Sequence, residues 1–289
     1  MAVFWNKIKR KNNSFRTCPV KCFAFIFSFF LFSSLVCAQG DLLIFPKRIV
    51  LDDRKRVKQL ILSNIGKDTT IYNVSFLQYR MNENGGFKAI TTPDVGQYFA
   101  TPYLRVYPRT VTLAPNESQT VKVQVNRSTK LEEGEYRSHL YFRAIKYNTP
   151  LGQKKNKVDP TSISVKIEAV FGISIATIIK KGTSNTITTI SNLSYEKDKE
   201  LNHFINFNLN RIGNMSTYGD IYINYVSDNN AIVEVAKVKG ISVYTPGEIR
   251  KVKIQLTTPK GITLTGGTFK VVYTANESKE ILAEAELDF

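Results

Sequence analysis

The chain has 289 residues, and its 40 lysines and arginines against 24 aspartates and glutamates give a formal net charge of +16. It has three cysteines, Cys18, Cys22 and Cys37, all near the N-terminus. A chain cleaved after them has neither disulfides nor cysteine–zinc sites to stabilise it. Such a chain depends on its hydrophobic core.

The first 38 residues predict a secretory signal peptide. Residues 1–21 carry six lysines and arginines and no acidic residue, and residues 22–36 form an apolar run rich in phenylalanine. We expect cleavage after Ala38 and an exported mature protein. The apolar run is short for a membrane span of about 20 residues, so an uncleaved anchor is the alternative. Cleavage leaves 251 of the 289 residues, enough for two domains.

The charge and the motifs argue against several classes of function. The leader takes six positive charges with it, so the mature net charge falls from +16 to +10. An exported chain rarely meets nucleic acid, and basic charge suits solubility, an acidic protein partner or a membrane surface. The mature chain has only His139 and His203, without metal-binding spacing, and no cysteine nucleophile, G-x-S-x-G or phosphate-binding loop. We therefore predict no enzyme, no cofactor and no metal site.

The mature chain is predicted to be all β. Apolar and polar residues alternate along several stretches, and no stretch has a convincing period of 3.6 residues. Alternation with period 2 is typical of strands with one buried face. Short strands of this kind separated by turn residues indicate β-sandwiches. The clearest alternating stretches are residues 121–126, 136–144, 163–175, 251–256 and 280–289.

Residues 163–175 (ISVKIEAVFGISI) form the longest alternating row. At about 3.3 Å per residue the row spans roughly 40 Å, whereas an ordinary strand has about 5–6 residues. Part of the row is therefore a candidate for covering by another protein. The alternative is one long central strand, or two strands broken at Gly172. The basic segment before it, residues 147–160, is predicted to be a mobile connector.

An internal repeat divides the mature chain. The pattern P-x-E-x-x-x-V-K-[VI]-Q-[VL] occurs at residues 115–125 and again at 246–256, and Gly134 has a counterpart in Gly267. Two matches in the same order at nearly the same offset indicate duplicated domains. The repeat predicts two related sandwiches in tandem, joined near residues 178–182.

The mature chain contains, in this order, RIVLD at 48–52, LILSN at 60–64, ATPYLR at 100–105, LAP at 113–115 and a predicted strand at 135–145. These segments together resemble the PapD-like periplasmic pilus and fimbrial assembly chaperones, a family of two-domain immunoglobulin-like proteins. The resemblance implies two tandem immunoglobulin-like β-sandwiches, at residues 39–178 and 179–289.

The resemblance implies donor-strand complementation. A pilus subunit is an incomplete immunoglobulin-like sandwich, and the chaperone caps it by lending a strand whose alternate side chains fill the subunit's open groove. By this resemblance Ile163, Val165 and Ile167 are the donor residues. Arg48 binds the subunit's C-terminal carboxylate as a charge-assisted pair. Without the resemblance, Arg48 is an exposed charge on a strand.

One departure from the family bears on the anchor. The family adds a lysine from the long strand, and the matching position in the sequence is Gly172. The identity of the client subunit, the involvement of an outer-membrane usher and self-association through the donor strand stay open. The alternative function is a structural or adhesive two-domain sandwich of the cell envelope, with the long strand buried in its own core.

Overall fold

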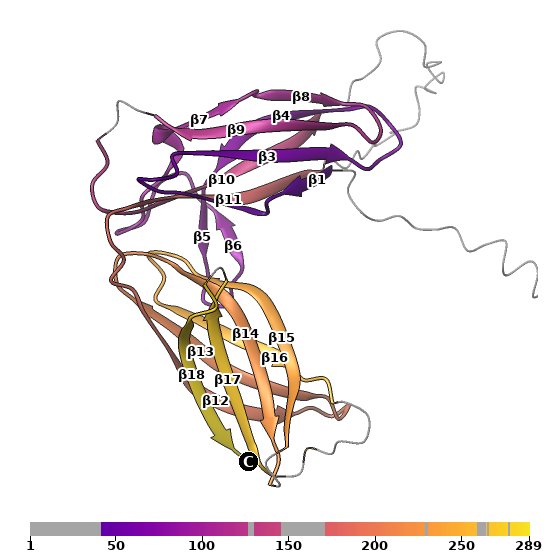
Figure 1. Ribbon diagram of the computed structural model, residues 1–289, viewed down its shortest axis with the longest axis vertical. Helices are drawn as coiled ribbons and strands as arrows, with labels where there is room; N and C mark the ends of the chain where they lie inside the picture. The colour runs from indigo at the N-terminus through magenta and orange to yellow at the C-terminus, as the bar shows by residue number, and fades with distance from the viewer. Residues whose placement is uncertain are drawn as a thin grey trace, which may run out of the picture. The chain divides into compact units, whose positions relative to one another are not determined.

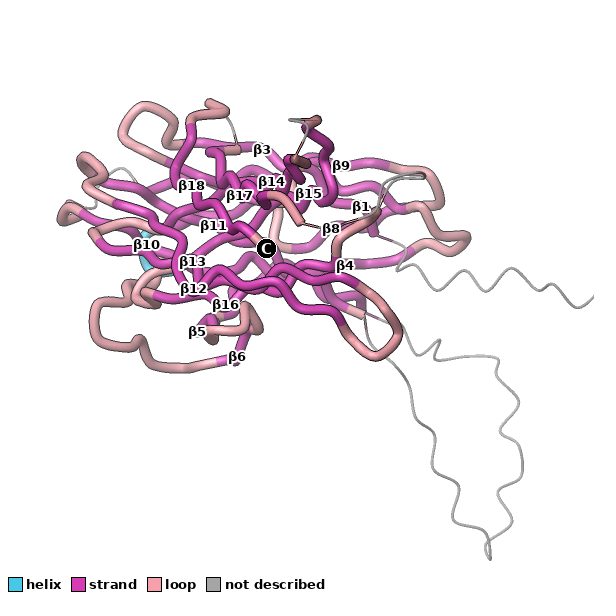
Figure 2. The backbone as a smooth tube through the Cα atoms, turned by 90° about the horizontal axis from the view of Figure 1, so that it is seen from below, coloured by secondary structure: helices cyan, strands magenta, loops and turns pink. Residues whose placement is uncertain are grey.

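The computed structural model describes residues 42–126, 130–145, 171–228, 231–258, 264, 266–276 and 278–289 (Figure 1). The predicted signal peptide, the connector at 147–160 and the donor residues Ile163, Val165 and Ile167 lie outside this part of the chain. Figure 2 shows strands throughout the described part and one short 3-10 helix, Thr101–Tyr103. No helix within the described residues is long and apolar enough to cross a membrane.

The first sandwich is built from two sheets. One has the order β1-β3-β9-β7 and the other the order β2-β11-β10-β4-β8. A two-stranded hairpin, β5 (Tyr79–Met81) with β6 (Phe87–Ala89), is added to them. The strands of the two sheets are β1 (Leu42–Phe45), β2 (Arg48–Leu51), β3 (Val57–Asn64), β4 (Thr70–Leu77), β7 (Leu104–Tyr107), β8 (Thr110–Leu113), β9 (Ser118–Val125), β10 (Gly134–Ile145) and β11 (Gly172–Lys181).

The strand order of the first sandwich is immunoglobulin-like. The strand order β1-β3-β9-β7 corresponds to strands A, B, E and D of an immunoglobulin domain. Strands β4, β10 and β11 correspond to its strands C, F and G. The chain changes sheets between β1 and β2, and β2 pairs with β11 in parallel while the other pairs are antiparallel. The predicted fold class, all-β with immunoglobulin-like sandwiches, is confirmed.

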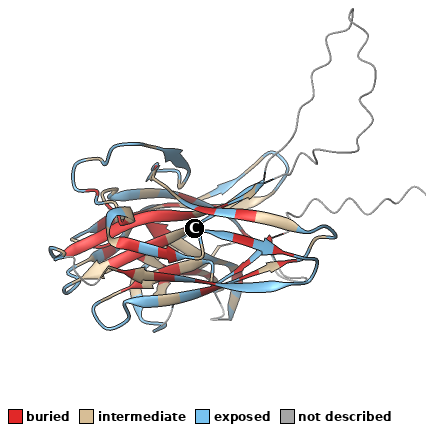
Figure 3. Ribbon diagram, turned by 90° about the horizontal axis from the view of Figure 1, so that it is seen from above, coloured by how far each residue is buried: buried red, intermediate tan, exposed pale blue. Residues whose placement is uncertain are grey.

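The first core follows the alternation in the sequence. The buried residues, red in Figure 3, recur along the strands. Among them, the fully buried ones include Leu60 and Leu62 of β3, Val121 and Val123 of β9, and Phe142 of β10. Burial of each such side chain contributes about 1.5–3 kcal/mol before the entropy cost of ordering the chain. The polar residues between them face away from this core, as period 2 requires.

The second sandwich has sheets in the orders β12-β13-β16 and β15-β14-β17-β18. Its core contains the fully buried rings of Phe269 and Tyr273. The predicted tandem sandwiches are confirmed, and the repeated motif runs into β9 in one and β16 in the other, strands that lie antiparallel to β3 and β13. The strands are β12 (Ile187–Lys197), β13 (His203–Ile212), β14 (Thr217–Val226), β15 (Ile232–Val243), β16 (Ile249–Gln255), β17 (Thr268–Ala275) and β18 (Ile281–Asp288).

Strand β11 contributes to both cores. Ile175 and Ile179 pack in the first core, whereas Ile178 is fully buried in the second. Met81, at the end of β5, also belongs to the second core. The two sandwiches form one compact unit, Gly40–Phe289. The boundary proposed from sequence, between residues 178 and 179, falls inside β11, and the next strand begins only at Ile187.

Candidate functional site

Arg48 lies on the face of β2 that points away from the first core. Its neighbours Ile49 and Leu51 are buried in that core, so alternation turns Arg48 the other way. In register, Arg48 pairs with Ala176 of β11, and Ala176 pairs with His139 of β10. These three residues therefore form a row across one face of the sheet.

The guanidinium of Arg48 has unused hydrogen-bond donors. Its Cζ lies 3.9 Å from the ring centre of Tyr218 on β14 and 5.8 Å from that of Tyr244, which follows β15. Its Nε and Nη2 are buried and have no hydrogen-bond partner within the described structure. Nε and Nη2 are the two donors on one side of a guanidinium, the arrangement that binds a carboxylate through two parallel hydrogen bonds.

Arg137 of β10 is a second buried guanidinium on this face. It is only 3% exposed, and its Cζ lies 4.5 Å from the ring centre of Tyr244. Its Nη2 donates to the carbonyl oxygen of Thr245 at 3.3 Å, while Nε and Nη1 find no partner among the described residues. Burial lowers the pKa of Arg137, and Tyr244 and Glu135 oppose that shift. The alternation along β10 did not indicate a site residue here, because it predicts a solvent-facing side chain for Arg137.

A pocket of about 520 Å³ opens beside Arg48. One side is formed by Arg48, Ala176 and His139, and an aromatic wall is formed by Tyr79, Phe87 and Tyr244. The aromatic rings come from the β5–β6 hairpin and from the segment after β15. The site therefore combines a cation with an aromatic wall.

His139 is a neutral member of this pocket. It is 5% exposed, and its ring meets those of Tyr79 and Phe87 edge-on, with centroids 4.9 and 5.5 Å apart. Burial, followed by the charge of Arg137, lowers the pKa of His139 to about 3. The imidazole is therefore uncharged at neutral pH.

The first half of β11 has a free edge beside the pocket. Strand β2 pairs only with Ala176 to Ile179, whereas β10 pairs with β11 along its whole length from Gly172. On the β2 side, residues 172–175 thus have no strand neighbour in the described part of the chain. An edge with unpaired N–H and C=O groups can accept another strand.

Phe171 corrects one expectation from the alternating row. The alternation puts Phe171 on the same side of the row as Ile173 and Ile175, which pack in or against the first core, but the Phe171 side chain is 66% exposed. Its carbonyl oxygen accepts a hydrogen bond from the Ala144 N–H at 3.1 Å, next to the end of β10 at Ile145. Because β10 ends there, Phe171 lies past the limit of the core that Ile175 joins.

Gly172 does not lie beside Arg48. It pairs with Arg143, four residues along β11 from Ala176, and a Cβ at this position would collide with the ring of Tyr141. The residue of β11 next to Arg48 is Ala176, so no lysine stands there. The second cation of this face is instead Arg137.

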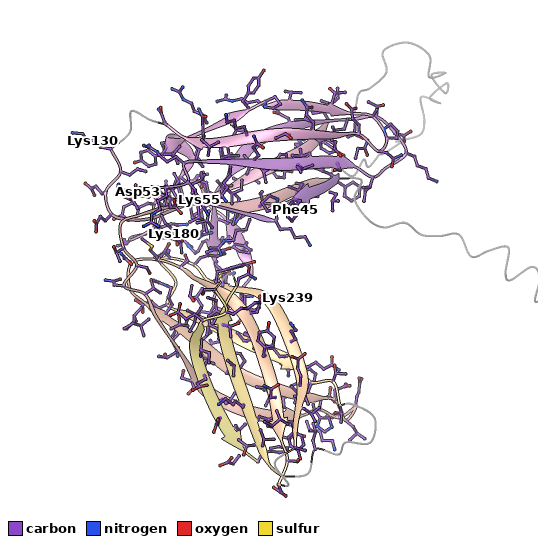
Figure 4. All side chains as sticks on the ribbon, viewed as in Figure 1. Phe45, Asp53, Lys55, Lys130, Lys180 and Lys239 are labelled. Carbon is purple, nitrogen blue, oxygen red and sulfur yellow. The ribbon has the colours of Figure 1, made fainter. Side chains whose placement is uncertain are left out.

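The two lysines at the end of β11 differ in their surroundings. Lys181 forms an ion pair with Asp53 at 2.7 Å, which lowers the pKa of that carboxyl. Lys180 lines one pocket together with Arg48 and Tyr218 and a second one together with Asp53 (Figure 4). Within the described residues, no group of three or more histidines, cysteines, aspartates and glutamates is arranged to hold a metal.

No protein-family model matches the chain, and no curated protein matches its sequence. Similar solved structures include the YadV chaperone, at 11% identity and a TM-score of 0.42, covering 86% of this chain and 100% of that one. The class 5 fimbriae chaperone CfaA is 16% identical, with a TM-score of 0.39 and coverages of 86% and 98%. A chain from a chaperone–tip adhesin complex of CFA/I fimbriae biogenesis is 15% identical, with a TM-score of 0.40 and coverages of 86% and 98%. All three of these structures are described as chaperones or chaperone complexes, and two of the descriptions name fimbriae.

Proposed function

We propose that this protein is a periplasmic, non-enzymatic chaperone that caps incomplete immunoglobulin-like subunits of a surface fibre by donor-strand complementation. The observation that carries the proposal is the free edge of β11 at residues 172–175, which leads directly to the unpartnered guanidinium of Arg48. Ile163, Val165 and Ile167 precede this edge in the chain and would extend it.

The register favours one direction for the client strand. Strand β2 runs parallel to β11 and begins its pairing at Arg48 opposite Ala176. A client strand that pairs with residues 172–175 and runs in the same direction as β2 has its C-terminal end beside Arg48, where β2 begins. Its C-terminal carboxylate then meets Nε and Nη2 of Arg48. Main-chain hydrogen bonds along the edge supply affinity, and alternate side chains supply specificity.

Arg137 supports an anionic ligand at this site. A buried cation without a paired anion is costly, because desolvation disfavours the charged form. Its neighbour Glu135 is already engaged by the N–H and hydroxyl of Ser216. A carboxylate beside Arg48 lowers the positive potential that both guanidiniums create. The pair thus offers a physical substitute for an arginine–lysine anchor.

The proposal is tested by co-expressing this protein with small exported β-proteins that are encoded by neighbouring genes. We expect Arg48→Ala and Val165→Glu each to reduce the pulled-down client at least about tenfold, because each leaves a buried charge unpaired. The melting temperature of the free protein should change little, since Arg48 forms no ion pair within the described structure. Arg54→Ala, an exposed arginine of the β2–β3 loop, is the matched control.

Two outcomes contradict the proposal. Equal client yield for Arg48→Ala and the wild type removes Arg48 from the site. Strong destabilisation of the free protein by Val165→Glu places the row in its own core, and the structural or adhesive sandwich then replaces the chaperone.

A further inference from the structure

We infer that the pocket beside Arg48 also binds the side chain of the client's last residue, and that this side chain is aromatic. The inference rests on the proposed function, because it requires the client's carboxylate to bind Arg48. It adds a chemical specificity for the client that carboxylate binding alone does not give.

The size of the pocket is the first argument. Its volume is about 520 Å³, whereas a water molecule takes up about 30 Å³ in the liquid. A carboxylate group alone therefore leaves most of the pocket unfilled. The side chain attached to the same terminal residue is the nearest part of the client that can fill it.

The wall of the pocket selects the kind of side chain. The rings of Tyr79, Phe87 and His139 are in edge-on contact, and Phe87 lies 6.2 Å from Tyr244 between ring centroids. Phe87 is 49% exposed, so it has ring surface left for a ligand to cover. Aromatic rings favour edge-to-face or offset contacts with one another. A terminal phenylalanine or tyrosine finds several such contacts here.

The charges of the pocket disfavour other terminal residues. His139 is neutral, so the wall that it forms with Tyr79 and Phe87 offers no cation for a second carboxylate. The faces of aromatic rings are electron-rich, which repels an aspartate placed against Tyr79 and Phe87. A terminal lysine or arginine meets Arg48 and Lys47 in the same pocket.

The aromatic wall is fixed in position. Met81, next to the hairpin turn, packs in the second core. Glu83 in the turn accepts a backbone hydrogen bond from Lys251 at 2.7 Å and also forms an ion pair with it. Gly85 takes a positive φ of 80° directly against the guanidinium of Arg250. Because the hairpin is held at these points, Phe87 needs little ordering when a ligand binds.

Peptide titrations test the inference with the purified protein. The probes are fluorescent eight-residue peptides of one alternating apolar–polar sequence that end in Phe, Gly or Asp with a free carboxylate, and the Phe peptide as its C-terminal amide. We expect the Phe peptide to bind about tenfold more tightly than the Gly peptide, the scale on which pockets discriminate apolar groups. The Asp peptide should bind more weakly than the Phe peptide because it makes no ring–ring contacts, and the amide should bind more weakly than the Gly peptide.

Two variants test whether the preference for a terminal phenylalanine depends on this pocket. Phe87→Ala should abolish the tenfold preference for Phe over Gly and leave the affinity for the Gly peptide unchanged. Phe45→Ala is the matched control, because Phe45 is 68% exposed on β1 and does not line the pocket (Figure 4). This variant should keep both affinities.

The outcomes separate the two claims. Equal affinity for Phe, Gly and Asp peptides, with the amide binding weakly, overturns the aromatic pocket and leaves the carboxylate anchor in place. Equal affinity for the acid and amide forms, or no binding of any peptide, overturns the anchor at Arg48 and the inference with it. A preference for Phe that survives Phe87→Ala places the terminal side chain elsewhere.

Discussion

Arg48 and Arg137 lie on the same face of one sheet but differ in how exposed they are and in their hydrogen bonds. Arg137 is held by the Thr245 carbonyl and by Tyr244, and its exposure of 3% leaves little access for a ligand. Arg48 is half-buried, borders the pocket and keeps both donors of one side unpartnered. Arg48 is thus suited to touch a ligand, and Arg137 to set the potential that the ligand meets.

His139 makes the stability of the protein depend on pH. Its pKa is about 3 in the folded state and about 6.5 in an unfolded chain, so the unfolded state binds the extra proton between these values. Stability is therefore lost as the pH falls from 6.5 towards 3, at about 1.4 kcal/mol per pH unit for one proton. Urea unfolding at pH 6, 5 and 4 should show this slope in the wild type, in excess of that of His139→Gln. Parallel curves for the two proteins would show that His139 is protonated without penalty.

At the scale of the element, the two ends of the described part of β11 should respond oppositely to charge. Phe171→Glu places a carboxylate where the native ring is already 66% exposed, so we expect a change in the free energy of unfolding within about 0.5 kcal/mol. Ile175→Glu buries an unpaired carboxylate in the first core and should cost several kcal/mol. Thermal melting of the two variants measures this. Equal destabilisation would mean that Phe171 packs in a core.

The periodicity of the sequence predicted the strands and the side chains that face the nearest core. It did not predict which side chains on the opposite face are buried. Val121 and Val123 alternate with polar residues on a sheet with one solvated face, and the pattern found them correctly. On β10 the same reading placed Arg137 and His139 in solvent, whereas both are buried against other elements. Alternation reports which residues face the nearest core, and it carries no information about a second sandwich that covers the other face. The resemblance pointed to Arg48, but the aromatic wall of the pocket depends on a hairpin whose docking no local pattern encodes.

For the whole molecule, export predicts where the mature chain begins and whether it contains cysteine. All three cysteines precede Gln39, so a chain cleaved after Ala38 has no thiol. Intact-mass analysis of protein recovered from the periplasm should give an N-terminus at Gln39, and reductant should leave its melting temperature unchanged. A mass that retains Cys37, with or without attached lipid, would instead indicate an anchored protein.

The sharing of β11 and of the β5–β6 hairpin between two cores has a consequence for biosynthesis. Ile178 and Met81 fill positions in the second core, yet both are fixed by strands of the first sandwich. Domains of one chain generally fold as units, and the N-terminal domain is made first. The second core is therefore completed by residues of strands that belong to the first sandwich. A substitution that unfolds the first sandwich removes Ile178 and Met81 from the second core and leaves cavities there.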